Sequence, residues 1–121
     1  MTIKKYPIIP VPKPRQTRAD KYKKRPPVLR YRAFADECRL RKVHVPLYGA
    51  HITFVLPMPK GWSDKKKIDM NQMPHQQKPD VDNLAKALFD AVYSDDSKIW
   101  DARITKIWGF EGEIIIDSGC T

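Results

Sequence analysis

The chain has 121 residues, of which 41% are hydrophobic and 31% are charged, and its formal net charge at pH 7 is +9. This size and composition predict one globular domain over residues 1–121 and exclude a disordered or fibrous chain. No apolar run approaches the roughly 18 residues of a membrane-spanning helix. The first residues also lack the apolar stretch and cleavage site of a signal peptide. We therefore expect a cytoplasmic protein with no membrane partner.

The positive charge is concentrated toward the N-terminus. Residues 1–42 contain 14 Lys/Arg and 3 Asp/Glu, whereas residues 80–121 contain 4 Lys/Arg and 9 Asp/Glu. Such an asymmetry indicates a polyanionic partner. Nucleic acid is the first choice, because contacts to its phosphates supply most of the non-specific affinity of a protein for it. A basic surface that is simply well solvated is the alternative.

The N-terminal segment predicts extended and irregular backbone. Residues 6–14 contain four prolines, which exclude a helix and restrict any strand to a sheet edge. Residues 15–27 are polar and basic and end in two prolines, as expected of a loop. Long loops in small domains are often functional. We expect this basic loop to contact DNA through six side chains acting collectively: Arg15, Arg18, Lys21, Lys23, Lys24 and Arg25.

Two helices are predicted, over residues 28–42 and residues 83–93. In the first, apolar residues recur at spacings of three and four while basic residues occupy much of the remaining surface. One of its faces can therefore pack while the other meets phosphate. Cys38 lies on the packed face, and we expect it to be a small core residue because it has no metal-type partner nearby. The second helix has a clear apolar stripe: Leu84, Ala85, Leu88, Phe89 and Val92.

The remaining segments predict a loop and three strands. Residues 50–56 are β-branched and apolar and predict a strand, and residues 57–79 predict a long loop. Residues 99–117 predict two strands around a turn near Gly109–Gly112. The order of elements indicates an α+β fold, with a small mixed β-sheet and the two main helices packed on one face. We expect one face of the sheet to be filled by Trp100, Ile104, Ile107, Trp108 and Ile114–Ile116.

The second predicted helix is flanked by four aspartates. Aspartate is common at helix N-caps and in turns, so each of them has a purely structural alternative. His75, in the loop before this helix, is a weaker candidate for contact with DNA, because a lone histidine in a loop usually has no special role. The four aspartates lie within 17 residues of one another: Asp80, Asp82, Asp95 and Asp96.

The start of the helix decides whether Asp80 and Asp82 converge. Pro79 disfavours helical backbone in the residue before it, so the helix begins near Val81–Asn83 with Asp80 or Asp82 as its cap. Residues two apart share a face only where the chain is extended. Two carboxylates held close together repel each other unless a cation or a proton intervenes. Mg²⁺ suits such hard oxygen ligands, and it usually takes one or two carboxylates and keeps several waters.

Lys86 lies one helical turn after Asp82. Helical side chains lean toward the N-terminus, so we expect its ammonium to hold a scissile phosphate or to stabilise charge in a transition state. An ordinary surface Asp–Lys pair is the alternative. Asp90 lies roughly 12 Å from Asp82 at about 1.5 Å per residue, too far to share a metal ion, and we expect a structural or supporting role. The Asp95–Asp96 turn is the natural source of a third ligand.

These motifs resemble those of a known family. The stretch KPDVDNLAKALFDAV, residues 78–92, followed closely by DDS, residues 95–97, is similar to the signature of RusA-type Holliday junction resolvases, especially those of phages and prophages. The segments KPRQTR and RPPVLRYRAFADECR, residues 13–18 and 25–39, also look like that group. The likeness covers nearly the whole chain. The D-x-D-N-x-x-K core followed by an Asp-Asp turn is its most specific part.

The resemblance implies a structure-selective endodeoxyribonuclease in a bacterial or phage-infected bacterial cell. Such an enzyme resolves four-way (Holliday) junctions by paired Mg²⁺-dependent hydrolysis in DNA recombination and repair, acts as a homodimer, and accepts Mn²⁺ as a substitute. The resemblance implies a RusA-like fold. It places the catalytic positions on Asp80, Asp82, Lys86 and Asp96, and the metal ligands on the three aspartates.

Two alternatives stay open. The connection from Phe89 to Asp95 is shorter than in the best-known member of the family, so Asp95 is an alternative to Asp96 as the ligand. A different class of function is a non-catalytic basic nucleic-acid-binding protein, in which the aspartates would only cap a helix and form a turn.

Overall fold

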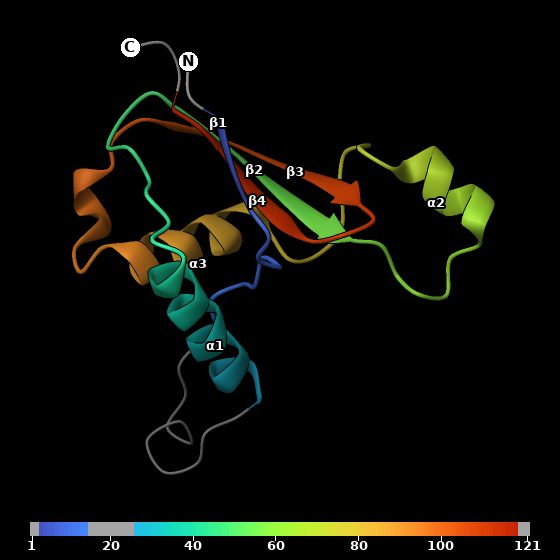
Figure 1. The fold of residues 1–121 in the computed structure, drawn as a ribbon, viewed down its shortest axis with the longest axis horizontal. Helices are drawn as coiled ribbons and strands as arrows, with labels where there is room; N and C mark the ends of the chain where they lie inside the picture. The colour runs from blue at the N-terminus through green and yellow to red at the C-terminus, as the bar shows by residue number, and fades with distance from the viewer. Residues whose placement is uncertain (1–2, 15–25, 119–121) are drawn as a thin grey trace.

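The computed structural model describes residues 3–14 and 26–118, which form a four-stranded sheet and three α-helices (Figure 1). None of the helices in these ranges combines the length and the apolar character needed to cross a membrane. The predicted basic loop falls almost entirely outside the described residues. In chain order the elements are β1 (Ile3–Tyr6), α1 (Pro26–Leu40), β2 (Ala50–Pro57), α2 (Asp64–Met70), α3 (Val81–Val92), the 3₁₀ helix η2 (Asp96–Lys98), β3 (Ala102–Gly109) and β4 (Glu113–Asp117).

The sheet is mixed, with strand order β1-β4-β2-β3. The central strand β2 pairs parallel with β3 and antiparallel with β4, and Ile52 at its middle lies opposite Ile104 and Ile116. β1 is an edge strand that ends at Tyr6, directly before the first of the prolines. This agrees with the restriction that those prolines place on the segment. The predicted mixed sheet is therefore confirmed.

The two C-terminal strands lie where the sequence predicts them, around a turn that includes Phe110–Gly112. They are not neighbours, because β2 lies between them. A parallel pair such as β2 and β3 needs a long crossover, and the chain between these strands contains α2, α3 and η2. This crossover carries every candidate catalytic residue.

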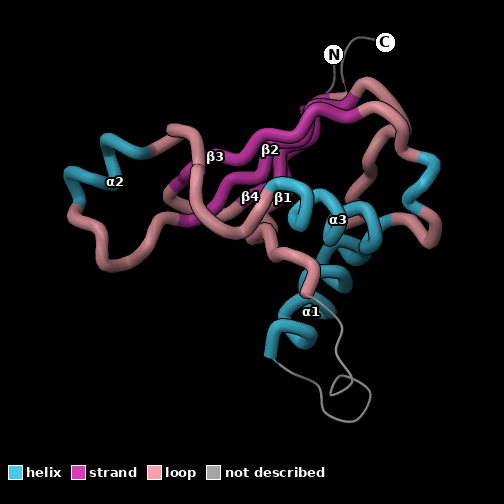
Figure 2. Tube along the Cα trace, turned by 180° about the vertical axis from the view of Figure 1, so that it is seen from behind, coloured by secondary structure: helices cyan, strands magenta, loops and turns pink. Residues whose placement is uncertain are grey.

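Helices α1 and α3 pack against each other, and both views place them on the same side of the sheet (Figures 1 and 2). α1 buries Phe34, Ala35 and Cys38, and α3 buries Leu84 and Leu88. These side chains belong to one core cluster with the inner face of the sheet. Two helices on one face are therefore confirmed. Cys38 is a fully buried core residue as predicted, and burial raises the pKa of its thiol to about 11.

One correction concerns residues 57–79, which the sequence analysis treats as a loop. They contain α2, which stands beyond one end of the sheet, away from α1 and α3 (Figure 1). Ser63 caps this helix by accepting a hydrogen bond of 3.2 Å from the backbone N–H of Lys66. The helix buries none of its residues. It therefore lacks the apolar periodicity by which helices are recognised in a sequence.

A second correction concerns Trp100, which is expected on the packed face of the sheet. It precedes β3 and is 73% exposed, with its ring stacked on Tyr48 at 5.6 Å between centroids. Trp108, inside β3, is buried and packs against Trp62 with 4.8 Å between centroids. Trp100 can make an apolar contact outside the sheet because the large face of its indole stacks on the Tyr48 ring.

Candidate active site

The mouth of α3 is formed by Asp80 and Asp82. Asp80 is the N-cap residue, with extended backbone (φ −71°, ψ 151°), and the helix begins at Val81. This confirms the predicted start of the helix. Val81 is already helical, however, so the extended stretch from Asp80 to Asp82 on which their convergence was expected to depend is absent. The Asp80 side chain makes no capping hydrogen bond, although capping is the usual role of an aspartate at this position. Asp82 lies in the first helical turn, and both residues are exposed.

Neither carboxylate at the mouth forms a hydrogen bond or ion pair with another described residue. The positive end of the α3 dipole favours negative charge at this place, which stabilises the two carboxylates without using their oxygens. Mg²⁺ usually binds one or two carboxylates and completes its shell with water. The donor set at the mouth of α3 therefore fits a hydrated Mg²⁺ ion.

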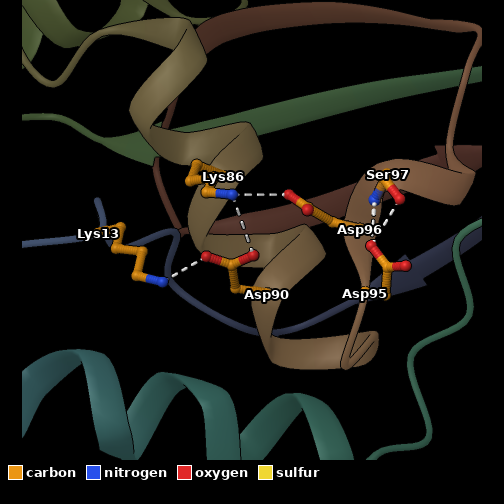
Figure 3. Close-up of polar contacts among 6 residues, drawn as sticks. All are labelled: Lys13, Lys86, Asp90, Asp95, Asp96 and Ser97. Carbon is orange, nitrogen blue, oxygen red and sulfur yellow. Dashed lines mark hydrogen bonds and ion pairs between the residues drawn. The ribbon is translucent and has the colours of Figure 1, made fainter.

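A second group of charged side chains lies farther along α3, and we call it the lysine–aspartate cluster: Lys13, Lys86, Asp90 and Asp96 (Figure 3). The ammonium of Lys86 donates a hydrogen bond of 2.9 Å to Asp96 Oδ2 and lies 3.4 Å from Asp90 Oδ1. The other carboxylate oxygen of Asp90 accepts a hydrogen bond from Lys13. Two lysines and two aspartates therefore compensate one another.

The electrostatics of this cluster follow from its contacts. The hydrogen bond to Asp96 raises the pKa of Lys86, with the Asp90 charge adding to the effect. The same hydrogen bond is the main reason why the pKa of Asp96 lies below its usual value. Both residues are therefore held in their charged forms. Asp90 has a side chain only 18% exposed and two lysine partners, which agrees with the structural role expected for it.

Lys86 points in a different direction from the one expected. From the sequence we expect its ammonium back at the mouth of α3, whereas the structure places it against Asp90, one turn farther along the helix, and Asp96 of η2. The physical reason is that two carboxylates attract the ammonium more strongly than a rotamer preference directs it. Lys86 is half exposed, so its ammonium is still accessible to a phosphate.

The two aspartates of the turn have different hydrogen-bond partners. The Asp95 side chain accepts hydrogen bonds from the backbone N–H (3.1 Å) and the hydroxyl (2.6 Å) of Ser97, and these bonds, the hydroxyl first, lower its pKa. Asp95 therefore caps its own short helix. Asp96 instead faces Lys86 on α3 (Figure 3). This arrangement favours Asp96 over Asp95 as the residue of the turn that takes part in the site.

The three proposed metal ligands are not gathered into one cluster. Within residues 3–14 and 26–118, no three Asp, Glu, His or Cys side chains come close enough to hold a metal ion. Asp96 is engaged by Lys86, which keeps it from the mouth of α3. The assignment of Asp80, Asp82 and Asp96 as joint ligands of Mg²⁺ therefore stays a prediction, of which the mouth supplies two members.

His75 belongs to the core around Trp108 rather than to an exposed surface. It is 5% exposed, and its ring lies 4.0 Å from the Trp108 ring between centroids. Burial lowers its pKa, and the neighbouring charge of Lys106 adds to the effect. The histidine is therefore held in its neutral form, and the structure gives it a packing role.

All six named side chains of the predicted DNA-contacting loop lie outside the described residues. Lys13, shortly before that loop, has a defined position. The backbone N–H of Lys13 donates a hydrogen bond of 3.4 Å to the carbonyl of Asn83 in α3, and its side chain reaches Asp90. The chain therefore enters residues 15–25 from a point directly beside α3. Arg30 and Arg32 of α1 are exposed, as expected for its polar face.

The comparison with known protein families agrees with the resemblance found in the sequence. The family model of endodeoxyribonuclease RusA matches residues 6–117, which includes α1, the mouth of α3 and the η2 turn. A protein of Bacillus subtilis (strain 168) described as the uncharacterized protein YqaN is 35% identical over 66 residues. That match covers 48% of this chain and 46% of the length of YqaN.

Proposed function

Since the chain belongs to the endodeoxyribonuclease RusA family, we propose that it resolves four-way (Holliday) DNA junctions by paired, Mg²⁺-dependent hydrolysis in recombination and repair, in the cytoplasm. The observation that carries this proposal is the pair of exposed carboxylates at the mouth of α3. Asp80 occupies a capping position without capping, so its oxygens are available to a ligand that the helix itself does not supply.

Each residue of the site has a proposed task. Asp80 and Asp82 would hold Mg²⁺, with Asp96 as a third ligand once it is released from Lys86. Bound Mg²⁺ would polarise the scissile phosphate and make a bound water a better nucleophile. Lys86 would then stabilise the negative charge that develops on the phosphate in the transition state. The charged form of Lys86, which its present partners favour, is the form that this task requires.

The proposed DNA contact follows from charge and position. The loop that contains Arg15, Arg18, Lys21, Lys23, Lys24 and Arg25 begins beside α3, so phosphates bound by its basic side chains would lie near the acidic site. A junction has near-twofold symmetry and is resolved by two nicks. A homodimer would supply two such sites related by the same symmetry.

The test is a cleavage assay on a synthetic four-way junction with and without Mg²⁺, or Mn²⁺ as the substitute metal. The unmodified protein should produce paired, symmetric nicks, and Asp82→Asn should reduce their rate at least about 10³-fold, since losing several kcal/mol of charge stabilisation costs a factor of ten per 1.36 kcal/mol. Binding of the junction, measured in Ca²⁺, should be retained or tightened, because a negative charge facing phosphate is removed.

Asp64→Asn is the matched control. Asp64 is also an exposed aspartate in the first turn of a helix, α2, so the substitution removes the same charge without touching the mouth of α3. It should leave cleavage unchanged. Tight binding of the junction with no cleavage in any divalent metal would instead favour a non-catalytic nucleic-acid-binding protein, and loss of binding in Asp82→Asn would indicate a structural role for that residue.

A further inference from the structure

The segment that leads into the mouth of α3 lies along the free edge of β3. The backbone N–H of Gln72 donates to the carbonyl of Trp108 (2.8 Å), and the N–H of Trp108 donates to the carbonyl of Met73 (3.0 Å). The N–H of His75 then donates to the carbonyl of Lys106 (3.1 Å). Residues 72–75 are thus attached to β3 by backbone hydrogen bonds.

Among the described residues, this backbone ladder stops at His75, five residues before Asp80. From there a side chain of β3 continues the attachment. The ammonium of Lys106 donates hydrogen bonds to the carbonyls of Gln77 and of Pro79, the second at 2.6 Å. Pro79 is the residue directly before Asp80. The hydrogen bonds therefore extend from the sheet to within one residue of the proposed metal ligand.

We propose that Lys106 is a positioning residue of the active site, which holds the backbone of residues 77–79 and thereby sets the place and direction of the Asp80 carboxylate. The proposal rests on the function proposed above, because it concerns how Asp80 is presented to a metal ion. Lys106 acts through the backbone of the loop and is not itself assigned contact with substrate.

The chemistry of lysine suits this task. An ammonium has three donors, so it can bind two carbonyls at once, and hydrogen bonds from a charged donor are stronger than neutral ones. Asp80 itself has extended backbone and uses no side-chain bond to hold its position. Its placement must therefore come from the residues before it and from the start of the helix. Groups that orient a metal ligand typically change metal affinity by 10–100-fold when they are lost.

A simple stabilising role for Lys106 predicts different results from a positioning role. If the two hydrogen bonds only stabilise the loop, their loss lowers the free energy of unfolding and leaves the metal affinity of the folded protein unchanged. If they position Asp80, their loss leaves the fold intact and weakens metal binding at the mouth of α3. The distinction is therefore open to measurement on the folded protein.

The experiment compares three variants of the full chain. Lys106→Met keeps the aliphatic stem and removes the donors. Lys106→Arg restores a charged donor that can reach the same carbonyls, and Arg103→Met removes an exposed basic side chain from the same strand as the control. Amide hydrogen exchange of residues 76–83 is measured without metal. Binding of Mn²⁺ is measured by electron paramagnetic resonance without DNA, and the Mg²⁺ concentration for half-maximal junction cleavage is measured last.

For Lys106→Met we expect faster exchange confined to residues 76–83, and about tenfold weaker binding of Mn²⁺ with a matching rise in the Mg²⁺ requirement. Lys106→Arg should restore most of the protection from exchange and most of the Mn²⁺ affinity. Arg103→Met should change neither the exchange of residues 76–83 nor the Mn²⁺ affinity. Unchanged Mn²⁺ affinity in Lys106→Met, or a loss of stability spread over the whole protein with normal metal binding, would overturn the proposal.

The result is separable from a failure of the proposed function. If the unmodified protein binds Mn²⁺ at the mouth of α3 but does not cut a junction, the proposed reaction is wrong while the exchange and Mn²⁺ measurements still decide the role of Lys106. If cleavage occurs and Lys106→Met shares the Mg²⁺ dependence of the unmodified protein, the function stands and the positioning role is wrong.

Discussion

Two groups of aspartates lie at α3 and the turn that follows it. They differ in whether lysine side chains bind their carboxylates. In the lysine–aspartate cluster, Asp90 and Asp96 are each bound by a lysine. At the mouth of the helix, Asp80 and Asp82 have no such partner among the described residues. The two regions consist of the same residue type on one helix and its following turn. They differ in whether the protein itself supplies the compensating charge.

The difference indicates what each region is for. Compensated carboxylates are typical of structural ion pairs, and Asp90, which is bound by Lys13 and Lys86, is of this kind. Two neighbouring carboxylates without a positive side chain repel each other and cost stability unless a cation arrives from solution. Asp80 and Asp82 have no such positive partner among the described residues, and this supports the proposal that the mouth of α3 binds a cation.

Among the substitutions that test this comparison, those in the η2 turn are expected to change the rate of junction cleavage most. Asp96→Asn should reduce junction cleavage about 100-fold, the upper range for loss of a group that orients or binds a metal, because it removes a charge that faces Lys86. Asp95→Asn should keep cleavage within about threefold of the unmodified protein. Asparagine is as good an N-cap as aspartate, so it can still accept the hydrogen bonds from Ser97.

Steady-state cleavage at saturating Mg²⁺, with circular dichroism as a check on folding, measures both variants. A large loss of activity in Asp95→Asn together with an active Asp96→Asn would reverse the assignment that the structure favours. Equal losses in the two variants would show that the turn acts as one unit, and that the ligand is not a single residue.

A smaller effect is expected inside the lysine–aspartate cluster. Asp90→Asn should lower the free energy of unfolding by about 1–2 kcal/mol, because it leaves the partly buried ammonium of Lys13 without its carboxylate. Urea denaturation measures the change. The combined variant Lys13→Met, Asp90→Asn should lose less than the sum of the two single substitutions, since the pair is removed together.

The same variant tests whether Asp90 is structural. Asp90→Asn should leave the Mg²⁺ concentration for half-maximal cleavage unchanged, because Asp90 lies roughly 12 Å along the helix from Asp82 at about 1.5 Å per residue. A rise in that concentration comparable to the effect of Asp82→Asn would place Asp90 in the metal site and would remove the division between the two regions.

The smallest effect concerns the pH dependence of stability at the loop before the mouth. Burial places the pKa of His75 in the folded protein below the ordinary histidine value of about 6.5. Below about pH 6.5 the unfolded chain therefore binds a proton that the folded protein does not, so stability is lost as the pH falls from 6.5 toward the folded pKa. His75→Phe should flatten this part of the pH profile.

Thermal unfolding at several pH values between 7.5 and 5, a range chosen to bracket the ordinary histidine pKa of about 6.5, measures the profile. The exposed His44 provides the control, because His44→Gln removes a histidine without opening the core. A pH profile of His75→Phe that is as steep as that of the unmodified protein would assign the acid sensitivity to other groups.

Much of the local structure could be read from the residues alone, because it depends on neighbours in sequence. Pro79 and the apolar spacing of residues 84–92 predict where α3 begins and which face it buries, and the structure agrees. The prolines of residues 7–14 exclude a helix there, Cys38 is predicted to lie in the core, and the structure agrees with both. The family of the chain was also accessible, since its signature is a run of residues closely spaced in sequence.

Other features depended on which segments meet in space. The strands β3 and β4 follow each other in the chain, but β2 enters between them, and no local pattern states which strand is a neighbour. The direction of Lys86 is set by Asp96 of the next element. Lys106 gave no distinctive signal, since β3 also contains Arg103 and Thr105, until the fold brought the carbonyls of Gln77 and Pro79 to its ammonium.

The sequence by itself determined the start of α3 and the family, because helix caps, proline and motif spacing act over a few residues. Only the tertiary structure decided which carboxylates are compensated and which are not. That decision requires Lys13 and Lys86 to reach Asp90 and Asp96, and charge compensation depends on distance in space rather than on distance along the chain.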